Sequence, residues 1–240
     1  MATVTLSCRG KTSQISLADW FQVYKDYAPL EVTGVFGFME EFSPLYGGRQ
    51  YIGAEITEED FKFMLASGLK LKIPLTAHKV SEKEYEESRE LLNKYYYPGN
   101  SIAIVNDDLA KWIKRDYPNY LIEASVIKNV NWKDIDTTLE LYDTVVLSMD
   151  KNDDHENLKK IKQKDKIVLF GNAGCAYTCP SKICYPSVSK VNKGEQEEMK
   201  CSMNLKPREK NYVHNFDLEE LRGLGFNNFK FVTVHTGSGF

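Results

Sequence analysis

The sequence predicts an α/β fold, a single small (β/α)8 TIM-like barrel that occupies residues 1–240. Apolar, β-branched segments alternate with amphipathic segments along almost the whole chain. Several of the apolar segments are continuous runs, as expected for strands of a parallel sheet that is covered on both faces. The expected strands are Thr3–Cys8, Val32–Phe38, Leu69–Leu75, Ser101–Val105, Tyr120–Val126, Thr144–Ser148, Ile167–Gly171 and Phe229–Val234.

Helix-start signals lie between these strands. Ser81 and Glu84 form a full capping box, and the helix that they open is expected to run towards residues 95–97. Gly68 stands where a left-handed residue would end the preceding helix. The chain stops soon after the last expected strand, so a final covering helix is not expected. The expected helix starts are Ser16, Thr57, Ser81, Asn106, Asp154 and Asp217.

An open doubly wound sheet is the alternative fold. It is disfavoured because no GxGxxG or GxxxxGK[ST] loop follows an early strand. The net charge of −3 gives no global attraction to nucleic acid or to anionic lipid. No apolar stretch has the length of a membrane span or the character of a signal peptide. We therefore expect a cytoplasmic protein without a membrane partner, in which clustered cysteines favour metal binding or catalysis over disulfides.

Four of the five cysteines lie close together, with the spacing C-x3-C-x4-C-x16-C. They fall on a predicted insertion loop at about residues 172–215. Thiolate is the soft ligand that selects zinc or an iron–sulfur cluster. The first pair fits a zinc knuckle, but the second pair does not, and irregular ligation suits a four-iron, four-sulfur (4Fe-4S) cluster. Structural zinc and ordinary thiols remain the alternatives. The predicted ligands are Cys175, Cys179, Cys184 and Cys201, whereas Cys8 is expected to be a buried core thiol.

One stretch also resembles a known family. It reads DTVVLSMDKNDDHENLKKIKQKDKIVLFGNAGCAYTCP. It is similar to the collagenase-like peptidase family of TIM-barrel proteins, and most to its iron–sulfur members, which hydroxylate ubiquinone precursors or RNA bases without oxygen. The resemblance covers roughly residues 100–185 and implies a cluster held by cysteines, with Cys175 and Cys179 matching best. The positions of Cys184 and Cys201 depart from the family pattern.

Polar residues that follow the predicted strands are the other candidates, because active sites of such barrels lie at the carboxyl ends of the strands. His78, Asp150 and Asn172 are predicted to be catalytic: His78 as a proton donor or acceptor, and the other two as orienting groups. Arg49 could hold a carboxylate or phosphate in a bidentate fork. Loop polarity, helix capping and turn formation are the plain alternatives. The predicted substrate-binding residues are Arg49, Ser125, Asn152 and His235.

Three functions follow from these features. The first is an iron–sulfur enzyme that performs redox or oxygen-independent hydroxylation chemistry on a small-molecule or nucleobase substrate, served by an electron donor or partner protein. The second is a zinc-stapled module that binds RNA or protein through the lysine-rich segment between residues 182 and 212. The third is a peptidase-like hydrolase, which the name of the resembling family implies.

Overall fold

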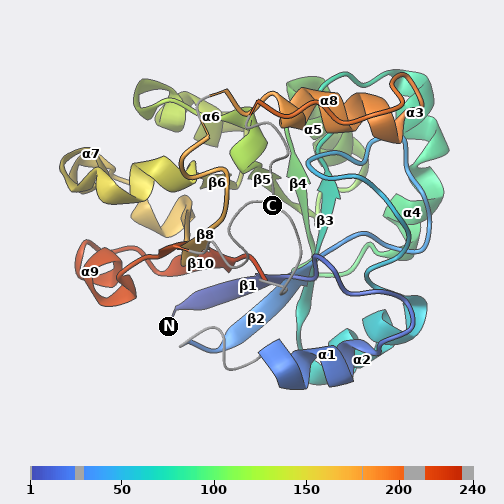
Figure 1. The fold of residues 1–240 in the computed structure, drawn as a ribbon, viewed down its shortest axis with the longest axis horizontal. Coiled ribbons are helices and arrows are strands. Elements are labelled where there is room, and N and C mark those ends of the chain that lie inside the picture. Colours follow the sequence, from blue (N-terminus) through green and yellow to red (C-terminus); the bar gives the residue numbers. More distant parts are fainter. Residues whose placement is uncertain (1, 25–29, 180, 203–213, 234–240) are drawn as a thin grey trace.

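Eight parallel strands close into a barrel in the computed structural model, which describes residues 2–24, 30–179, 181–202 and 214–233 (Figure 1). Around the barrel the order is β1-β10-β7-β6-β5-β4-β3-β2, and β1 closes the circle by pairing with both β2 and β10. The predicted fold class is confirmed. The strands are β1 (Thr3–Ser7), β2 (Val32–Phe36), β3 (Lys70–Leu75), β4 (Ser101–Ile104), β5 (Leu121–Ala124), β6 (Thr144–Val146), β7 (Ile167–Phe170) and β10 (Asn228–Phe231).

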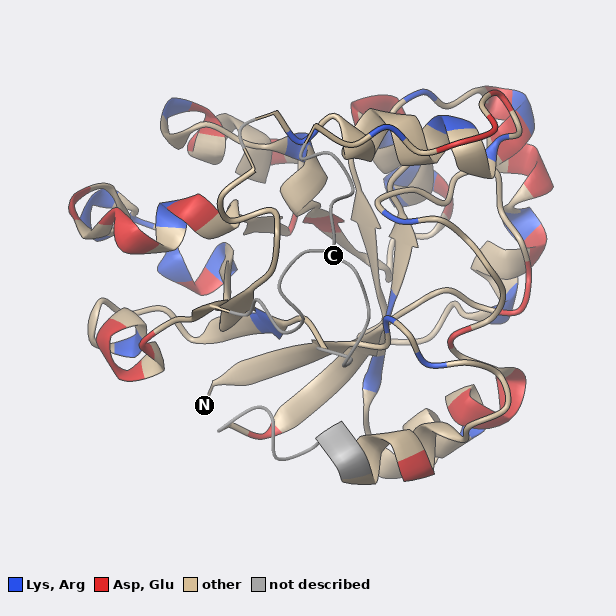
Figure 2. Ribbon diagram, in the orientation of Figure 1, with Lys and Arg blue, Asp and Glu red and all other residues tan. Residues whose placement is uncertain are grey.

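Helices cover the outside of the barrel, with one or two between most successive strands (Figure 1). Figure 2 shows that Lys, Arg, Asp and Glu gather on these helices and are sparse on the strands. Within the described part of the chain, no helix is long and apolar enough to cross a membrane. The helices are α1 (Leu17–Tyr24), α2 (Glu58–Ser67), α3 (Glu82–Glu87), α4 (Arg89–Lys94), α5 (Asp107–Asp116), α6 (Ile135–Leu141), α7 (His155–Lys160), α8 (Cys184–Asn192) and α9 (Leu218–Gly223).

Side-chain caps explain where several helices begin. Thr57 and Ser81 form the expected capping boxes. Each hydroxyl accepts a hydrogen bond from the backbone N–H of the third helical residue, and the acidic side chain of that residue accepts one from the backbone N–H of the capping residue. Gly68 ends α2 with φ 73°, as predicted. The helix that begins at Glu82 is broken at Ser88, which the sequence did not predict. The Ser88 hydroxyl donates to the Glu84 carbonyl, a local bond that competes with the regular helix.

The segment at 172–215, predicted as a cysteine-bearing insertion loop, contains short elements of secondary structure. It begins with β8 (Asn172–Ala173), which pairs antiparallel with β9 (His214–Asn215). Between them, helix α8 begins at Cys184 and lies beside α3 (Figure 1). The absence of a helix after the last strand is not tested, because the residues beyond 233 lie outside the described ones.

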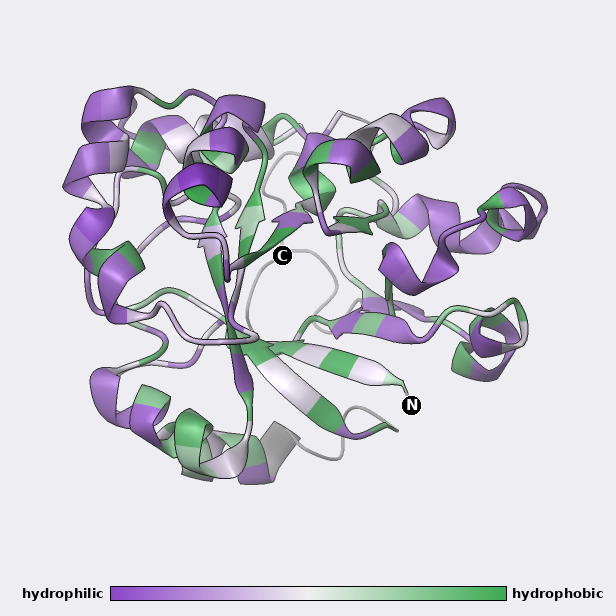
Figure 3. Cartoon of the chain, turned by 180° about the vertical axis from the view of Figure 1, so that it is seen from behind, coloured by the Kyte–Doolittle hydropathy of each residue, from purple (hydrophilic) through white to green (hydrophobic). Residues whose placement is uncertain are grey.

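The core lies inside the barrel and between the strands and the covering helices. Figure 3 shows apolar colour along the strands and polar colour on the helix faces away from the barrel. Cys8 is fully buried in this core, as predicted, and burial raises the pKa of its thiol far above the usual range. Three charged residues are also buried on strands, namely Lys72, Glu123 and Lys230.

Candidate functional site

A cavity of about 450 Å³ lies at the carboxyl end of the barrel. It brings together residues that follow four different strands, which is where barrels of this type build their active sites. Two of the predicted catalytic residues and one predicted metal ligand line the same space. Among the lining residues are His78, Asp150, Tyr177, Cys179, Lys182 and Tyr185.

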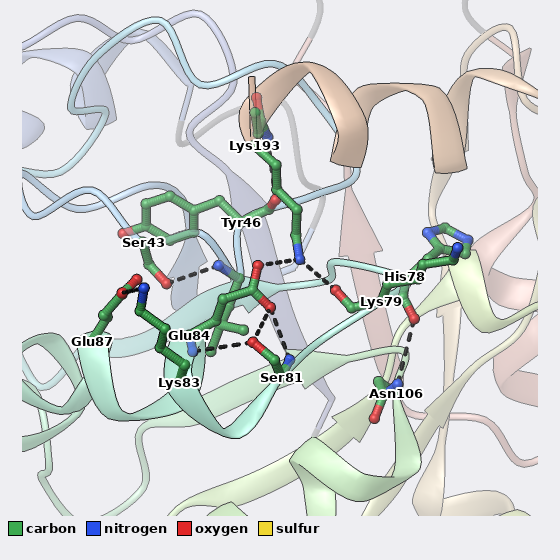
Figure 4. A network of polar contacts seen from close by, with 12 residues as sticks. Ser43, Tyr46, His78, Lys79, Ser81, Lys83, Glu84, Glu87, Asn106 and Lys193 are labelled. Carbon is green, nitrogen blue, oxygen red and sulfur yellow. Dashed lines mark hydrogen bonds and ion pairs between the residues drawn. The ribbon is translucent and has the colours of Figure 1, made fainter. Parts of the chain in front are cut away.

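His78 follows β3 and is held at its backbone. Its carbonyl accepts a hydrogen bond from Nδ2 of Asn106 at 3.4 Å (Figure 4). Burial lowers the pKa of the imidazole below its usual value, so the ring is neutral at neutral pH. Its Nδ1 atom is buried, and no hydrogen-bond partner for it exists among the described residues. A neutral imidazole with one uncommitted nitrogen is suited to accept or donate a proton.

Asp150 lies on the 3-10 turn η4 (Met149–Asp153), directly after β6. Its Oδ1 is 3.1 Å from Nζ of Lys182. Burial raises the pKa of Asp150, but hydrogen bonds from Lys182 and Ser148 outweigh it and hold the pKa below its ordinary value. Lys182 itself has φ 49°, a left-handed conformation that is uncommon for a residue other than glycine. The cavity wall therefore carries a charged carboxylate and a conformationally constrained lysine.

Cys179 is a hydrogen-bond acceptor in the same wall. Its Sγ receives the backbone N–H of Lys182 at 3.3 Å and lies 3.4 Å from the hydroxyl of Ser202. Burial raises the pKa of the thiol, yet these hydrogen bonds and the charge of Lys182 lower it below the usual value. Cys179 therefore forms the thiolate, which binds metal and attacks carbonyls, more readily than an ordinary cysteine does.

Cys184 opens helix α8 and has the other three predicted ligands as electrostatic neighbours. Burial is the largest cause that raises the pKa of its thiol, and the negative charges of Cys175, Cys179 and Cys201 raise it further. All four side chains are half-buried. Among the described residues, no three cysteine, histidine or acidic side chains stand in a metal-ligating arrangement. The four thiols thus share one neighbourhood, and their joint ligation of a metal stays a prediction.

Arg9, in the loop after β1, is a site residue that the sequence did not suggest. Burial lowers the pKa of its guanidinium to about 10, and nearby Arg49 acts in the same direction. The thiolates of Cys175 and Cys184 act in the opposite direction. A cation therefore lies near two of the four predicted ligands.

Arg49 is only 14% exposed and is not a solvated loop residue. Its guanidinium pairs with both carboxylate oxygens of Glu55 and lies over the rings of Phe36 and Phe38, at 5.2 and 4.8 Å from their centroids. The fork that could hold a substrate anion is thus occupied by Glu55. The role of Arg49 as a substrate anchor stays a prediction.

The remaining predicted residues have structural partners. Ser125 caps the 3-10 turn η2 (Val126–Lys128). The Asn152 amide is buried and donates to the Phe170 carbonyl at 2.6 Å. The Asn172 amide bonds both the N–H and the carbonyl of Val232, so its two ends are used to fix the backbone after β10. His235 lies outside the described residues.

Helix α8 is fastened to the barrel at its carboxyl end. Lys193 donates to the carboxylate of Glu84 on α3 and to the carbonyl of Lys79 (Figure 4). Asn192 accepts from the backbone N–H of Tyr51 and donates to the carbonyl of Arg49. Because Lys79 follows His78 in the chain, the same contacts join the cysteine-bearing segment to the loop that carries His78.

Lys72, Glu123 and Lys230 were also missed. A signal existed, because KLKIPL, LIEA and NFKF each place one charged residue inside an apolar strand. Charged residues are almost never fully buried without a partner. The sequence could not say that these three strands would direct their charges at one another.

A search of solved structures found a similar fold in a structure titled "The Structure of the U32 Peptidase Mk0906". The TM-score is 0.64, and the alignment covers 98% of this chain and 94% of that chain, at 14% sequence identity. No protein-family model and no curated protein matches the sequence. At this identity the likeness concerns architecture. The chain is a TIM-like α/β barrel with the same fold as that structure.

Proposed function

We propose that this chain is an iron–sulfur enzyme whose cluster is held at the barrel rim by Cys175, Cys179, Cys184 and Cys201. The substrate, a small molecule or a nucleobase, would occupy the adjoining cavity and undergo redox or oxygen-independent hydroxylation chemistry. The observation that carries the proposal is the gathering of three thiols around Cys184, beside a cavity that also holds His78 and Asp150.

The donor set fits such a centre. It consists of sulfur alone, which is the preference of iron–sulfur clusters and of structural zinc. Thiolates that are close neighbours repel one another, and a cationic centre would relieve that repulsion. The N–H of Lys182 that points at Cys179 Sγ is the kind of hydrogen bond that tunes a cluster ligand.

A bound cluster supplies electron transfer, for which an external donor is needed. The protein groups do the remaining work. His78 can exchange a proton with the substrate through a neutral ring nitrogen. Asp150 and Lys182 present one negative and one positive group for orientation. Tyr177 and Tyr185 offer aromatic surface in the same cavity, which suits a planar ring.

Metal and sulfide analysis of protein purified without air tests the proposal. We expect a brown protein with about four irons and four sulfides per chain. Replacing Cys184 with serine should abolish this content, whereas Cys8→Ala, at a fully buried thiol outside the predicted ligand set, should retain it. One zinc and no iron would instead support a zinc-stapled binding module. If no preparation contains iron or zinc, the proposed metal centre is refuted.

A second candidate is a peptidase-like hydrolase. The observation in its favour is that Cys179, whose thiolate is stabilised, lines the same cavity as a neutral histidine. The solved structure with the similar fold is that of a protein named a peptidase. A hydrolase of this kind would lose activity on a generic peptide substrate in Cys179→Ser and keep it in Cys201→Ser. A cluster enzyme would lose its metal in both variants.

A further inference from the structure

The interior of the barrel contains a buried group of charges below the rim. Nζ of Lys72 on β3 pairs with Oε2 of Glu123 on β5, and Nζ of Lys230 on β10 lies 3.8 Å from Oε1 of the same carboxylate. The exposed side-chain fractions are 11% for Lys72, 1% for Glu123 and 7% for Lys230. None of these strands is adjacent to another of the three in the barrel, so the side chains meet across its interior.

Lys230 is the cation of this group that lies farther from the shared carboxylate. Its Nζ lies 3.6 Å from the centroid of the Phe36 ring. The residues beside it in the neighbouring strands are Thr5 on β1 and Phe170 on β7, and both are uncharged. A separation of 3.8 Å from Glu123 is too long for a hydrogen bond. Glu123 is already paired with Lys72, so one carboxylate faces two ammonium groups.

These surroundings favour the free amine. Burial lowers the pKa of Lys230 to about 7; Glu123 opposes this shift, while the charges of Lys72 and Arg49 add to it. The free amine of Lys230 is therefore populated at neutral pH. An ordinary lysine, with a pKa of about 10.4, is unprotonated there in fewer than about one molecule in a thousand. A lysine that is desolvated beside another cation is a known arrangement for a nucleophilic amine.

Glu123 supplies the proton transfers that such an amine needs. Its Oε1 atom is buried, and no hydrogen-bond partner for it exists in the described part of the chain. The group facing it is the Lys230 amine. An acceptor atom beside a nucleophile, with no other hydrogen bond at that atom, can take up a proton from the amine and return it to a leaving group.

We propose that Lys230 forms an imine with a small aldehyde or ketone that carries a negative charge. The lone pair of Nζ attacks the carbonyl carbon, and Glu123 carries one proton from the nitrogen to the oxygen, which gives a carbinolamine. Glu123 then carries the second proton from the nitrogen to the hydroxyl, which leaves as water while the C=N bond forms. One amine and one carbonyl give one imine and one water, and no oxidant or reductant is consumed. Lys72, the neighbouring cation in the same group, provides the preference for an anion, whereas Arg49 is occupied by Glu55.

Reductive trapping of the full-length protein tests this proposal. The protein is incubated at pH 7 with pyruvate and sodium cyanoborohydride, digested, and mapped by mass spectrometry. We expect one reduced pyruvate adduct on Lys230, formed with a pH midpoint near 7. The free-amine fraction at Lys230 is far above that of surface lysines, so the adduct on Lys230 should form before any other. An adduct spread over many lysines, or one that forms only above about pH 9, would overturn the proposal.

Variants supply the controls. Lys230→Arg should lose the adduct, and Lys70→Arg, an exposed lysine on the same strand as Lys72, should retain it. Glu123→Gln should slow trapping by roughly tenfold or more, although more of the amine is unprotonated without the carboxylate. Circular dichroism verifies that each variant is folded. If a variant does not fold, the adduct site mapped in the natural sequence still decides the proposal. Cys184→Ser should still form the Lys230 adduct, because no rim cysteine takes part in imine formation. This result would hold even if the proposed metal centre were lost or had never formed.

Discussion

Nζ of Lys11, in the loop after β1, lies 2.6 Å from Oδ2 of Asp60 in the first turn of α2, and both side chains are buried. The same carboxylate accepts the backbone N–H of Leu17 at 2.5 Å and that of Thr57 at 2.9 Å. One acidic side chain thus joins the loop after β1 and the starts of α1 and α2. Charge-assisted hydrogen bonds of this kind are short and strong.

Removing this carboxylate should destabilise the barrel strongly. Asp60→Asn leaves the Lys11 ammonium buried without a counter-charge, so we expect the free energy of unfolding to fall by about 3 kcal/mol or more. Urea unfolding followed by circular dichroism measures the change. Glu59→Gln is the matched control, because Glu59 is 81% exposed and should change the same quantity by less than about 0.5 kcal/mol. Equal effects in the two variants would contradict the assigned role of Asp60.

Gly47 lies where no larger residue fits. A Cβ atom there would lie 2.4 Å from the backbone oxygen of Thr76, at the end of β3. Gly47→Ala should therefore lower the free energy of unfolding by about 2 kcal/mol, because a backbone atom must move. Gly223, the last residue of α9, has open space around its Cα, and Gly223→Ala should raise stability by about 0.5 kcal/mol. The midpoint of thermal unfolding should fall in Gly47→Ala and rise in Gly223→Ala. Shifts of the same sign would contradict the close approach of Gly47 to the backbone of Thr76.

Lys193 should hold the carboxyl end of α8 in place. It is 8% exposed, and its ammonium bonds Glu84 and the Lys79 carbonyl. Lys193→Met leaves Glu84 without that partner and should cost about 1–2 kcal/mol. Hydrogen exchange of the α8 amides should become faster, while that of the barrel strands should not change. Lys190→Met, at an exposed position of the same helix, should leave α8 protected. Unchanged exchange in Lys193→Met would show that α8 is held by other contacts.

His78 should make stability depend on pH. Burial lowers its pKa in the folded state, so the unfolded chain binds a proton more readily. Stability is therefore lost as the pH falls through the unfolded pKa of about 6.5. We expect the free energy of unfolding to fall more for the natural sequence than for His78→Gln between about pH 7.5 and pH 5.5. Parallel curves for the two proteins would mean that the imidazole titrates normally.

Local sequence patterns determined the elements and their order. Continuous apolar, β-branched runs predicted every strand of the barrel to within a few residues, and capping residues such as Thr57, Ser81 and Asp217 marked helix starts. The break at Ser88 and the helix at Cys184 were missed. The first depends on one side-chain hydrogen bond, and the second on anchoring of α8 by Lys193 and Asn192.

The sequence by itself thus determined the barrel, the burial of Cys8 and the position of the cysteine-bearing segment after β7, because these follow from periodicity and from the order of elements. Only the tertiary structure decided which rim residues share a cavity, that Asn172 fixes the backbone of Val232, and that Lys72, Glu123 and Lys230 meet. The three charged residues lie on strands that are not neighbours in the sheet, and the other contacts join segments that are distant in the sequence. They exist only once the barrel has closed, and no local pattern encodes them.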